Sequence, residues 1–178
     1  ATLNDTSSAR FSQNASVNEL LGAPLVAGPR SVPCERRDGK GAQGFIASHD
    51  GYVQRFGLFH ERSLVLSHGG NVLDGVDRVF RAGGEPARNN GRDFVALRFH
   101  IHPEIELYED GQGRLVLTAR VADTWVFTAT GIEATVEESI FFAGLGGPRR
   151  TRQIVLSYKA SEFPEVRWRL TRTKLGAE

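Results

Sequence analysis

The sequence predicts an all-β protein, an antiparallel β-sandwich. Short stretches that alternate apolar and polar residues recur along most of the chain; Val166, Trp168 and Leu170, for example, would share one face of a strand. Turn sequences separate these stretches, and Asp110-Gly111 between two alternating segments is a strong hairpin signal. No segment of ten or more residues has a convincing helical period. Alternation with a period of two needs one buried and one solvated face, and many short strands with regular turns are typical of sandwiches and barrels.

The chain begins with an irregular lead-in, residues 1–33, in which "NDTSSARFSQNAS" is turn-prone and "GAPLVAGP" is punctuated by Gly and Pro. We expect the lead-in to pack on one sandwich domain that covers residues 34–178. Strands are predicted, in order, at residues 31–37, 41–50, 52–67, 72–81, 94–103, 105–110, 114–120, 124–131, 134–142, 151–159 and 166–173.

Composition narrows the class of protein. The chain has 178 residues, of which 40% are hydrophobic and 24% charged, as in a soluble globular domain. Its apolar runs, such as "IFFAGL", fall far short of the roughly 20 residues that span a bilayer, so we expect no transmembrane segment. The net charge of +1 gives no drive toward nucleic acid, and we expect no such partner. The chain starts with Ala, contains no Met and shows no signal peptide, which favours a piece of a longer protein.

The first candidate site is the stretch "SHDGYVQRFGLFHERSL". If this stretch runs as one strand without a bulge, Tyr52, His60 and Arg62 share one face and His49 lies on the other. Tyr and His could form a proton-transfer pair, with Arg neutralising a substrate carboxylate. These four residues are therefore the candidate catalytic residues. The favoured alternative is structural: this face is the core face, and its polar groups are hydrogen-bonded.

The second candidate site is "RFHIHPE". His100 and His102 are two residues apart, so in a strand both imidazoles project from one face, next to Arg98. Such a pair is half of a metal site and needs a third ligand, for which Glu104 or Asp93 is available. Arg98, His100 and His102 are also candidate substrate-binding residues. The alternative is that the apolar residues between them fill the core while the histidines face solvent.

The order of motifs resembles a known family. "ASHDGYVQRFGLFHERSLVLS", "LDGVDR", "ALRFHIHPEI" and "ATVEESIFFAGLGGPRRTRQIVLS" follow one another. This succession resembles the C-terminal part of bacterial heparinase II/III-like proteins, from about Leu3 to Leu170. H-D-G-Y occupies residues 49–52, and H-x-R is His60 and Arg62.

The resemblance implies the C-terminal β-sandwich portion of a polysaccharide lyase. Such enzymes cleave uronic-acid-containing glycans by removing the proton on C5 and eliminating the leaving group on C4. In the family an N-terminal α-toroid precedes the sandwich, a Tyr with His or Asn does the acid-base chemistry, and many members hold a divalent metal, zinc or calcium, by two His and one Asp. These catalytic and metal-binding positions have no counterpart here. We therefore expect no cofactor in this fragment and little activity from it alone.

Further expectations follow from the same resemblance. The parent protein would act on an acidic polysaccharide such as a glycosaminoglycan, in the bacterial cell envelope or periplasm, with the cytoplasm as the alternative. A homo-oligomer is a further alternative, because a fragment would expose unpaired sheet edges. The alternative function is a non-catalytic carbohydrate-binding or interaction module with exposed aromatic platforms such as Trp125 or Trp168, although both fall on the apolar phase of their strands. A cupin-like metal enzyme built on His100 and His102 ranks last.

Overall fold

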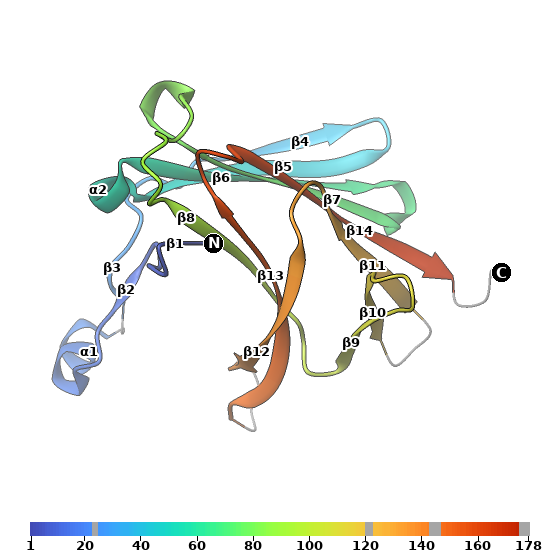
Figure 1. The fold of residues 1–178 in the computed structure, drawn as a ribbon. Helices are drawn as coiled ribbons and strands as arrows, with labels where there is room; N and C mark the ends of the chain where they lie inside the picture. The colour runs from blue at the N-terminus through green and yellow to red at the C-terminus, as the bar shows by residue number, and fades with distance from the viewer. Residues whose placement is uncertain (23–24, 120–122, 143–146, 175–178) are drawn as a thin grey trace.

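The computed structural model describes residues 1–22, 25–119, 123–142 and 147–174. Two antiparallel sheets face each other as a sandwich, as the sequence predicts (Figure 1). The smaller sheet has the order β1 (Thr2–Leu3), β8 (Phe94–His100), β13 (Arg149–Lys159), β12 (Ala134–Phe141). The larger sheet has the order β4 (Cys34–Gly39), β5 (Ala42–Tyr52), β6 (Leu58–Ser67), β7 (Val72–Phe80), β14 (Glu165–Lys174), β11 (Asp123–Ala129), β10 (Leu115–Ala119), β9 (Ile105–Glu109). In the parts of the chain that are described, no helix is long and apolar enough to cross a membrane.

The predicted single strand over residues 52–67 is wrong. A one-turn helix, α2 (Val53–Phe56), interrupts it, so that β5 and β6 form an antiparallel hairpin. Gly57 ends the turn with φ 68°, where its N–H donates to the carbonyl of Val53 at 2.9 Å. This left-handed conformation suits glycine and reverses the chain. The other predicted strands correspond to observed ones; Arg120, the end of the predicted strand 114–120, lies outside the described residues.

The lead-in contains regular structure. Its first residues join the smaller sheet as β1, where Thr2 lies opposite Ala96 of β8. Further along, β2 (Arg10–Phe11) and β3 (Leu25–Ala27) pair as a two-stranded sheet around α1 (Ala15–Leu21). The side chain of Asn14 accepts hydrogen bonds from the first turn of α1, as an N-cap does. Placing the domain boundary at residue 33 stays a prediction.

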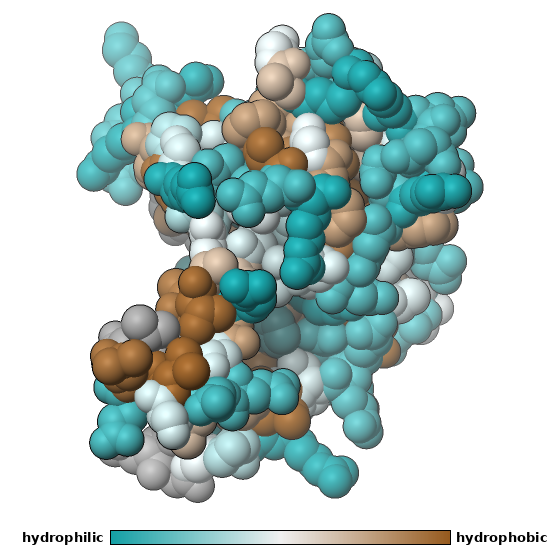
Figure 2. All heavy atoms as spheres, turned by 90° about the vertical axis from the view of Figure 1, so that its left-hand side faces the viewer, coloured by the Kyte–Doolittle hydropathy of each residue, from teal (hydrophilic) through white to brown (hydrophobic). Residues whose placement is uncertain are grey.

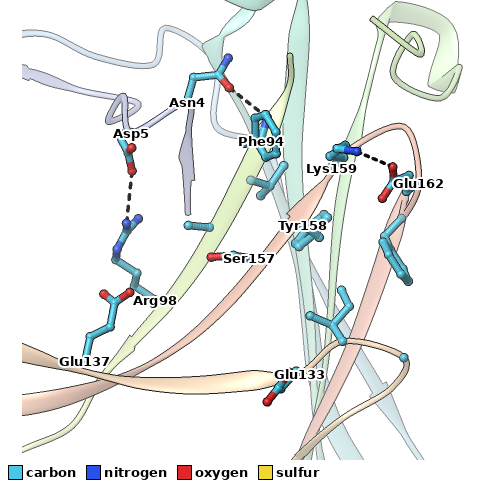
Figure 3. A pocket seen from close by; sticks show the side chains of 15 residues that line it. Asn4, Asp5, Phe94, Arg98, Glu133, Glu137, Ser157, Tyr158, Lys159 and Glu162 are labelled. Atoms are coloured by element: carbon cyan, nitrogen blue, oxygen red, sulfur yellow. Dashed lines mark hydrogen bonds and ion pairs between the residues drawn. The ribbon is translucent and has the colours of Figure 1, made fainter. Parts of the chain in front are cut away.

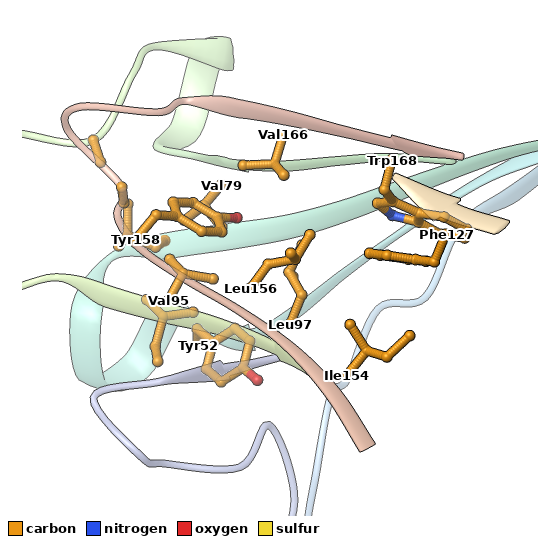
Figure 4. Close-up of a cluster of buried hydrophobic side chains, with 14 of the residues drawn as sticks. Tyr52, Val79, Val95, Leu97, Phe127, Ile154, Leu156, Tyr158, Val166 and Trp168 are labelled. Carbon is orange, nitrogen blue, oxygen red and sulfur yellow. The ribbon is translucent and has the colours of Figure 1, made fainter. Parts of the chain in front are cut away.

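The apolar core lies between the two sheets (Figure 4). The smaller sheet contributes Leu97 and Leu156, and the larger sheet contributes Val79 and Trp168, all of them buried. Gly75 of β7 makes room for the indole, because a Cβ atom there would lie 2.1 Å from the Trp168 ring. The core therefore needs glycine at this point of the L-x-G-x-D motif.

The side of the molecule turned to the viewer in Figure 2 is hollowed between an upper part with a mostly hydrophilic surface and a lower part where hydrophobic side chains gather. Large apolar side chains of the lead-in are among the exposed ones, notably Leu20 and Phe11, which are 85% and 60% exposed.

Candidate functional site

The β5–β6 hairpin brings together the four candidate catalytic residues. His49 and His60 are cross-strand partners, and their rings meet with 3.3 Å between Nε2 of His49 and Nδ1 of His60. A register shift after His49 then places Tyr52 opposite Leu58, with its ring centroid 5.3 Å from that of His49. The predicted separation of His49 from Tyr52, His60 and Arg62 on opposite faces of one strand is therefore wrong. It assumed an unbroken strand, and the hairpin turn and the register shift both break that alternation.

Asp77 of β7 is the centre of these contacts. It is fully buried, and its carboxylate accepts hydrogen bonds from His60 Nε2 at 2.7 Å and from Trp168 Nε1 at 2.8 Å. Nε of Arg62 donates to both carboxylate oxygens, at 2.9 and 3.1 Å. The guanidinium carbon of Arg62 also lies 5.7 Å from the centroid of the Trp168 ring. We call these residues the His–Asp cluster: His49, His60, Arg62, Asp77 and Trp168.

The direction of the hydrogen bonds assigns the histidine tautomers. The backbone N–H of Gly51 donates to Nδ1 of His49 at 3.2 Å, so this nitrogen is an acceptor. In the neutral ring the proton is then on Nε2, which donates to His60. His60 in turn donates from its own Nε2 to Asp77. Each ring nitrogen of both histidines is thus engaged, and neither has a lone pair left for a substrate proton.

The pKa values agree with this arrangement. Burial, followed by the neighbouring His60, lowers the pKa of His49 from 6.5 to about 4, so the ring is neutral at neutral pH. Burial on its own would raise the pKa of Asp77, but the hydrogen bond from His60 and the charge of Arg62 outweigh it, so the pKa lies below its ordinary value. Burial raises the pKa of Tyr52, which favours the protonated phenol. The cluster therefore combines a buried carboxylate with hydrogen-bond donors around it, and Arg62 supplies positive charge.

Arg62 differs from the other members of the cluster. Its Nη2 group is buried with no acceptor among the described residues. Of the four candidate catalytic residues, it is the one that retains an unused hydrogen-bond donor in the described parts of the chain. Its role in neutralising a substrate charge stays a prediction.

The H-D-G-Y motif, residues 49–52, also holds the lead-in. The Asp50 carboxylate accepts hydrogen bonds from the backbone N–H groups of Arg30 and Ser31, at 2.8 and 3.1 Å. The Tyr52 hydroxyl donates to the carbonyl of Ala1 at 2.6 Å. We call this segment the H-D-G-Y corner, because it fastens both ends of the lead-in to the larger sheet.

Gly51, the third residue of the corner, lets Ser8 of the lead-in lie close to β5. A Cβ atom at this position would lie 2.8 Å from Cβ and 2.9 Å from the carbonyl oxygen of Ser8. Glycine is therefore needed for the lead-in to pack against β5 at this point.

The second set of candidates lies apart from the cluster, on β8 and just after it. Arg98 donates to the Thr2 hydroxyl at 2.5 Å and pairs with Asp5 at 3.4 Å. Nδ1 of His100 lies 2.7 Å from the Ser139 hydroxyl, whereas His102 lies beyond the end of β8.

His102 accepts a hydrogen bond from the Glu104 backbone and packs edge-on against Phe141. His100 and His102 thus have different neighbours. Within the described residues, no group of three or more His, Cys, Asp and Glu side chains could hold a metal ion. The roles of these two histidines, and the expectation that this fragment holds no cofactor, stay predictions.

A hollow of about 920 Å³ lies on the smaller-sheet side, and Arg98 is the candidate residue that lines it (Figure 3). Its other cation, Lys159, is paired with Glu162 at 2.8 Å. Glu133 and Glu137 also line it, so carboxylates outnumber cations. This charge balance does not suit an acidic polymer.

The tryptophans do not form the exposed platforms that a carbohydrate-binding module would need. Trp168 is 5% exposed and its N–H is used by Asp77, while Trp125 is half-buried on β11. Arg167, Arg169 and Arg172 of β14 form ion pairs with neighbouring carboxylates.

Asp77 is a site residue that the sequence analysis did not predict. The available signal was its position in L-x-G-x-D: on β7, Gly75, Asp77 and Val79 are buried in alternation. A carboxylate on the apolar phase of a strand must be paired, since an unpaired buried charge is costly.

The fold and the cluster define a two-sheet β-sandwich domain with a buried polar network between its strands. The family model "Heparinase II/III-like, C-terminal" matches residues 1–169, and the chain belongs to this family. No curated protein sequence matches the chain.

Solved structures show the same fold at low sequence identity. The heparan sulfate lyase HepC from Pedobacter heparinus has a TM-score of 0.63 and 10% identity, with 94% of this chain and 28% of that one covered. A Heparinase III-BT4657 gene product has a TM-score of 0.58 and 12% identity, with 99% and 29% covered. A Heparinase III structure has a TM-score of 0.57 and 10% identity, with 83% and 22% covered. The chain spans less than a third of the length of these solved proteins.

Proposed function

We propose that this chain is the C-terminal β-sandwich portion of a polysaccharide lyase that acts on uronic-acid-containing glycans by β-elimination. The observation that carries the proposal is the family match over residues 1–169. The similar solved structures are a heparan sulfate lyase and heparinases, which supports an acidic polysaccharide as the substrate of the whole protein.

The chain alone would be inactive. β-Elimination needs a base for the C5 proton, a group that neutralises the carboxylate and a proton donor for the leaving oxygen. Both ring nitrogens of His49 and of His60 are engaged, and the Tyr52 hydroxyl donates to a backbone carbonyl. We therefore place the base and the proton donor in the part of the protein outside this chain, which in the family includes an α-toroid. Any divalent metal of the whole protein would also be held outside the described residues, and no step of the proposal involves it.

The proposal extends to location and assembly. The whole protein would meet its polymeric substrate in the bacterial cell envelope or periplasm. The proposal does not require a homo-oligomer. Four of the six residues of the edge strand β4 are charged, which disfavours pairing of this edge with another strand edge.

An elimination assay tests the proposal. The longer protein that contains this chain and the 178-residue chain alone would be incubated with heparan sulfate, alginate and polygalacturonate, with the ultraviolet absorbance of the unsaturated uronate as readout. We expect turnover by the longer protein on at least one polymer and none by the chain alone. Robust turnover by the chain alone, or none by the longer protein on any uronate polymer, would overturn the proposal.

A further inference from the structure

A second hollow, of about 600 Å³, lies beside the H-D-G-Y corner, between the lead-in and the start of α2. We call it the arginine groove. It is lined by residues 5–10, 27, 28, 30, 50, 51 and 53–55. It is distinct from the His–Asp cluster and from the hollow of Figure 3, with which it shares only Asp5 among its lining residues.

Three arginines from three segments line the groove: Arg10 on β2, Arg30 after β3 and Arg55 on α2. All three are exposed, and no described carboxylate forms an ion pair with any of them. Other arginines of the chain are paired in this way, as Arg98 is with Asp5. The groove therefore concentrates guanidinium groups whose charge no carboxylate of the described residues neutralises by direct contact.

The two carboxylates of the groove are already in use. Asp5 pairs with Arg98 at 3.4 Å, and Asp50 accepts two backbone N–H groups. Those backbone bonds lower the pKa of Asp50, because they stabilise its ionised form. Asp50 thus fixes the backbone that bears Arg30 and leaves the Arg30 guanidinium free for a ligand.

The uncharged lining indicates the kind of anion. Thr6, Ser7, Ser8 and Gln54 contribute hydroxyl and amide groups, and no aromatic residue lines the groove. Single-stranded nucleic acids are usually held by stacking of bases on aromatic side chains, which this lining does not offer. Hydroxyl and amide groups beside guanidinium forks match a sugar chain that carries carboxylate or sulfate groups.

The groove is also held in place. Gly51 packs directly on Ser8, and the hydrogen bonds of Asp50 fix residues 30 and 31. A ligand would therefore meet arginines whose backbones are already positioned, which reduces the entropy lost on binding.

We propose that the arginine groove binds a segment of an acidic glycan, with Arg10, Arg30 and Arg55 contacting its carboxylate or sulfate groups. This deepens the proposed function and rests on it for the polysaccharide nature of the ligand. The groove would hold the polymer on the sandwich side, away from the buried cluster.

The test uses the 178-residue chain and four probes in calorimetry: oligogalacturonate, dextran sulfate, neutral dextran and a single-stranded oligonucleotide. We expect binding of oligogalacturonate, dextran sulfate or both, and none of neutral dextran. The two charged glycans separate carboxylate from sulfate recognition. The variant Arg10→Gln/Arg30→Gln/Arg55→Gln should lose about ten-fold or more in affinity, since each charge-assisted contact contributes substantially.

The matched control is Arg92→Gln/Arg149→Gln/Arg150→Gln. It removes the same charge from exposed arginines that do not line the groove and have no described ion-pair partner. We expect its affinity to stay within about two-fold of the unmodified chain. Arg55→Gln alone, which leaves the lead-in unchanged, is the second variant and should weaken binding by about three-fold or more.

Three results would overturn the groove: no binding of either charged glycan, equal loss in the two triple variants, or tighter binding of the oligonucleotide than of the glycans. Failure of the proposed function looks different. In that case the longer protein shows no elimination activity, whatever the groove binds. If the longer protein is active but the groove variant binds the charged glycans as tightly as the unmodified chain, the groove proposal is overturned and the proposed function stands.

Discussion

Asp77 is the residue on which the His–Asp cluster depends. Three donors, from His60, Arg62 and Trp168, converge on its buried carboxylate. Removing the charge would leave Arg62 partly buried without its counter-ion. Breaking a buried pair in this way is more costly than losing an exposed one.

We expect Asp77→Asn to destabilise the chain by about 3 kcal/mol in urea unfolding, because the Asn amide group would face donors that need an acceptor. The matched control is Asp74→Asn on the same strand, which removes an ion pair with Arg169 whose two side chains are 41% and 55% exposed. Its effect should be much smaller. Equal effects of the two substitutions would show that the buried network adds no stability of its own.

His49 predicts a pH dependence of stability. Its pKa in the folded chain is about 4, below the ordinary value of 6.5 that applies to the unfolded chain. As the pH falls from 6.5 toward 4, the unfolded chain binds a proton that the folded chain does not, so the free energy of unfolding decreases across this window.

His49→Gln removes this titration. We expect the variant to lose less stability than the unmodified chain when the urea midpoint is compared at about pH 7 and about pH 4.5. A parallel pH dependence in the two proteins would contradict the assigned pKa. Carboxylates titrate in both proteins, so their contribution to the pH dependence of stability cancels when the two proteins are compared.

At the scale of elements, the β5–β6 hairpin and the lead-in depend on each other. The H-D-G-Y corner uses each of its residues: His49 contacts His60, Asp50 and Tyr52 bond to the lead-in, and Gly51 lets the lead-in approach. In its contacts this motif joins the β5–β6 hairpin to the lead-in, and the catalytic roles of His49 and Tyr52 stay predictions.

Gly51→Ala should loosen this fastening, because the new Cβ would lie 2.8 Å from Cβ of Ser8. We expect faster amide hydrogen exchange in residues 7–10 and 30–31, with the core strands β8 and β13 unchanged. Gly39→Ala is the control, since no atom lies within 4 Å of a Cβ at that position. Unchanged exchange in the lead-in of the Gly51 variant would show that the close approach is not needed.

Some elements of the fold could be predicted from the sequence and others could not. The strand β14 was predictable, because Val166 and Trp168 are buried while Arg167 and Arg169 are exposed, and burial of one face imposes the period of two. The hairpin turn was not, because Val53 to Phe56 suit a strand as well as a helical turn. Gly57, with φ 68°, was the local signal, since a glycine inside a strand pattern often marks a break. Strand order in the two sheets depends on contacts between distant segments, which no local pattern contains.

For the whole molecule, the family was recognisable because the motifs occur in order along one chain, and the family model confirms it over residues 1–169. The candidate site was only partly predictable. His49, Tyr52, His60 and Arg62 were singled out by residue type, but the partner of His60 and Arg62 is Asp77, which comes from another strand, and the partner of Tyr52 is the carbonyl of Ala1. Hydrogen-bond partners of this kind are set by tertiary packing and not by spacing in the sequence.

We infer that the His–Asp cluster and the H-D-G-Y corner hold the sandwich together, and that the reacting groups lie elsewhere in the whole protein. Steady-state kinetics of Tyr52→Phe and His49→Gln in the longer protein test this most directly, with each variant checked for folding by its thermal melt. We expect kcat within about two-fold of that of the unmodified protein, since a general acid or base contributes about 100-fold or more and we expect neither residue to act as one. A loss of kcat of about 100-fold or more in a variant that folds normally would contradict it.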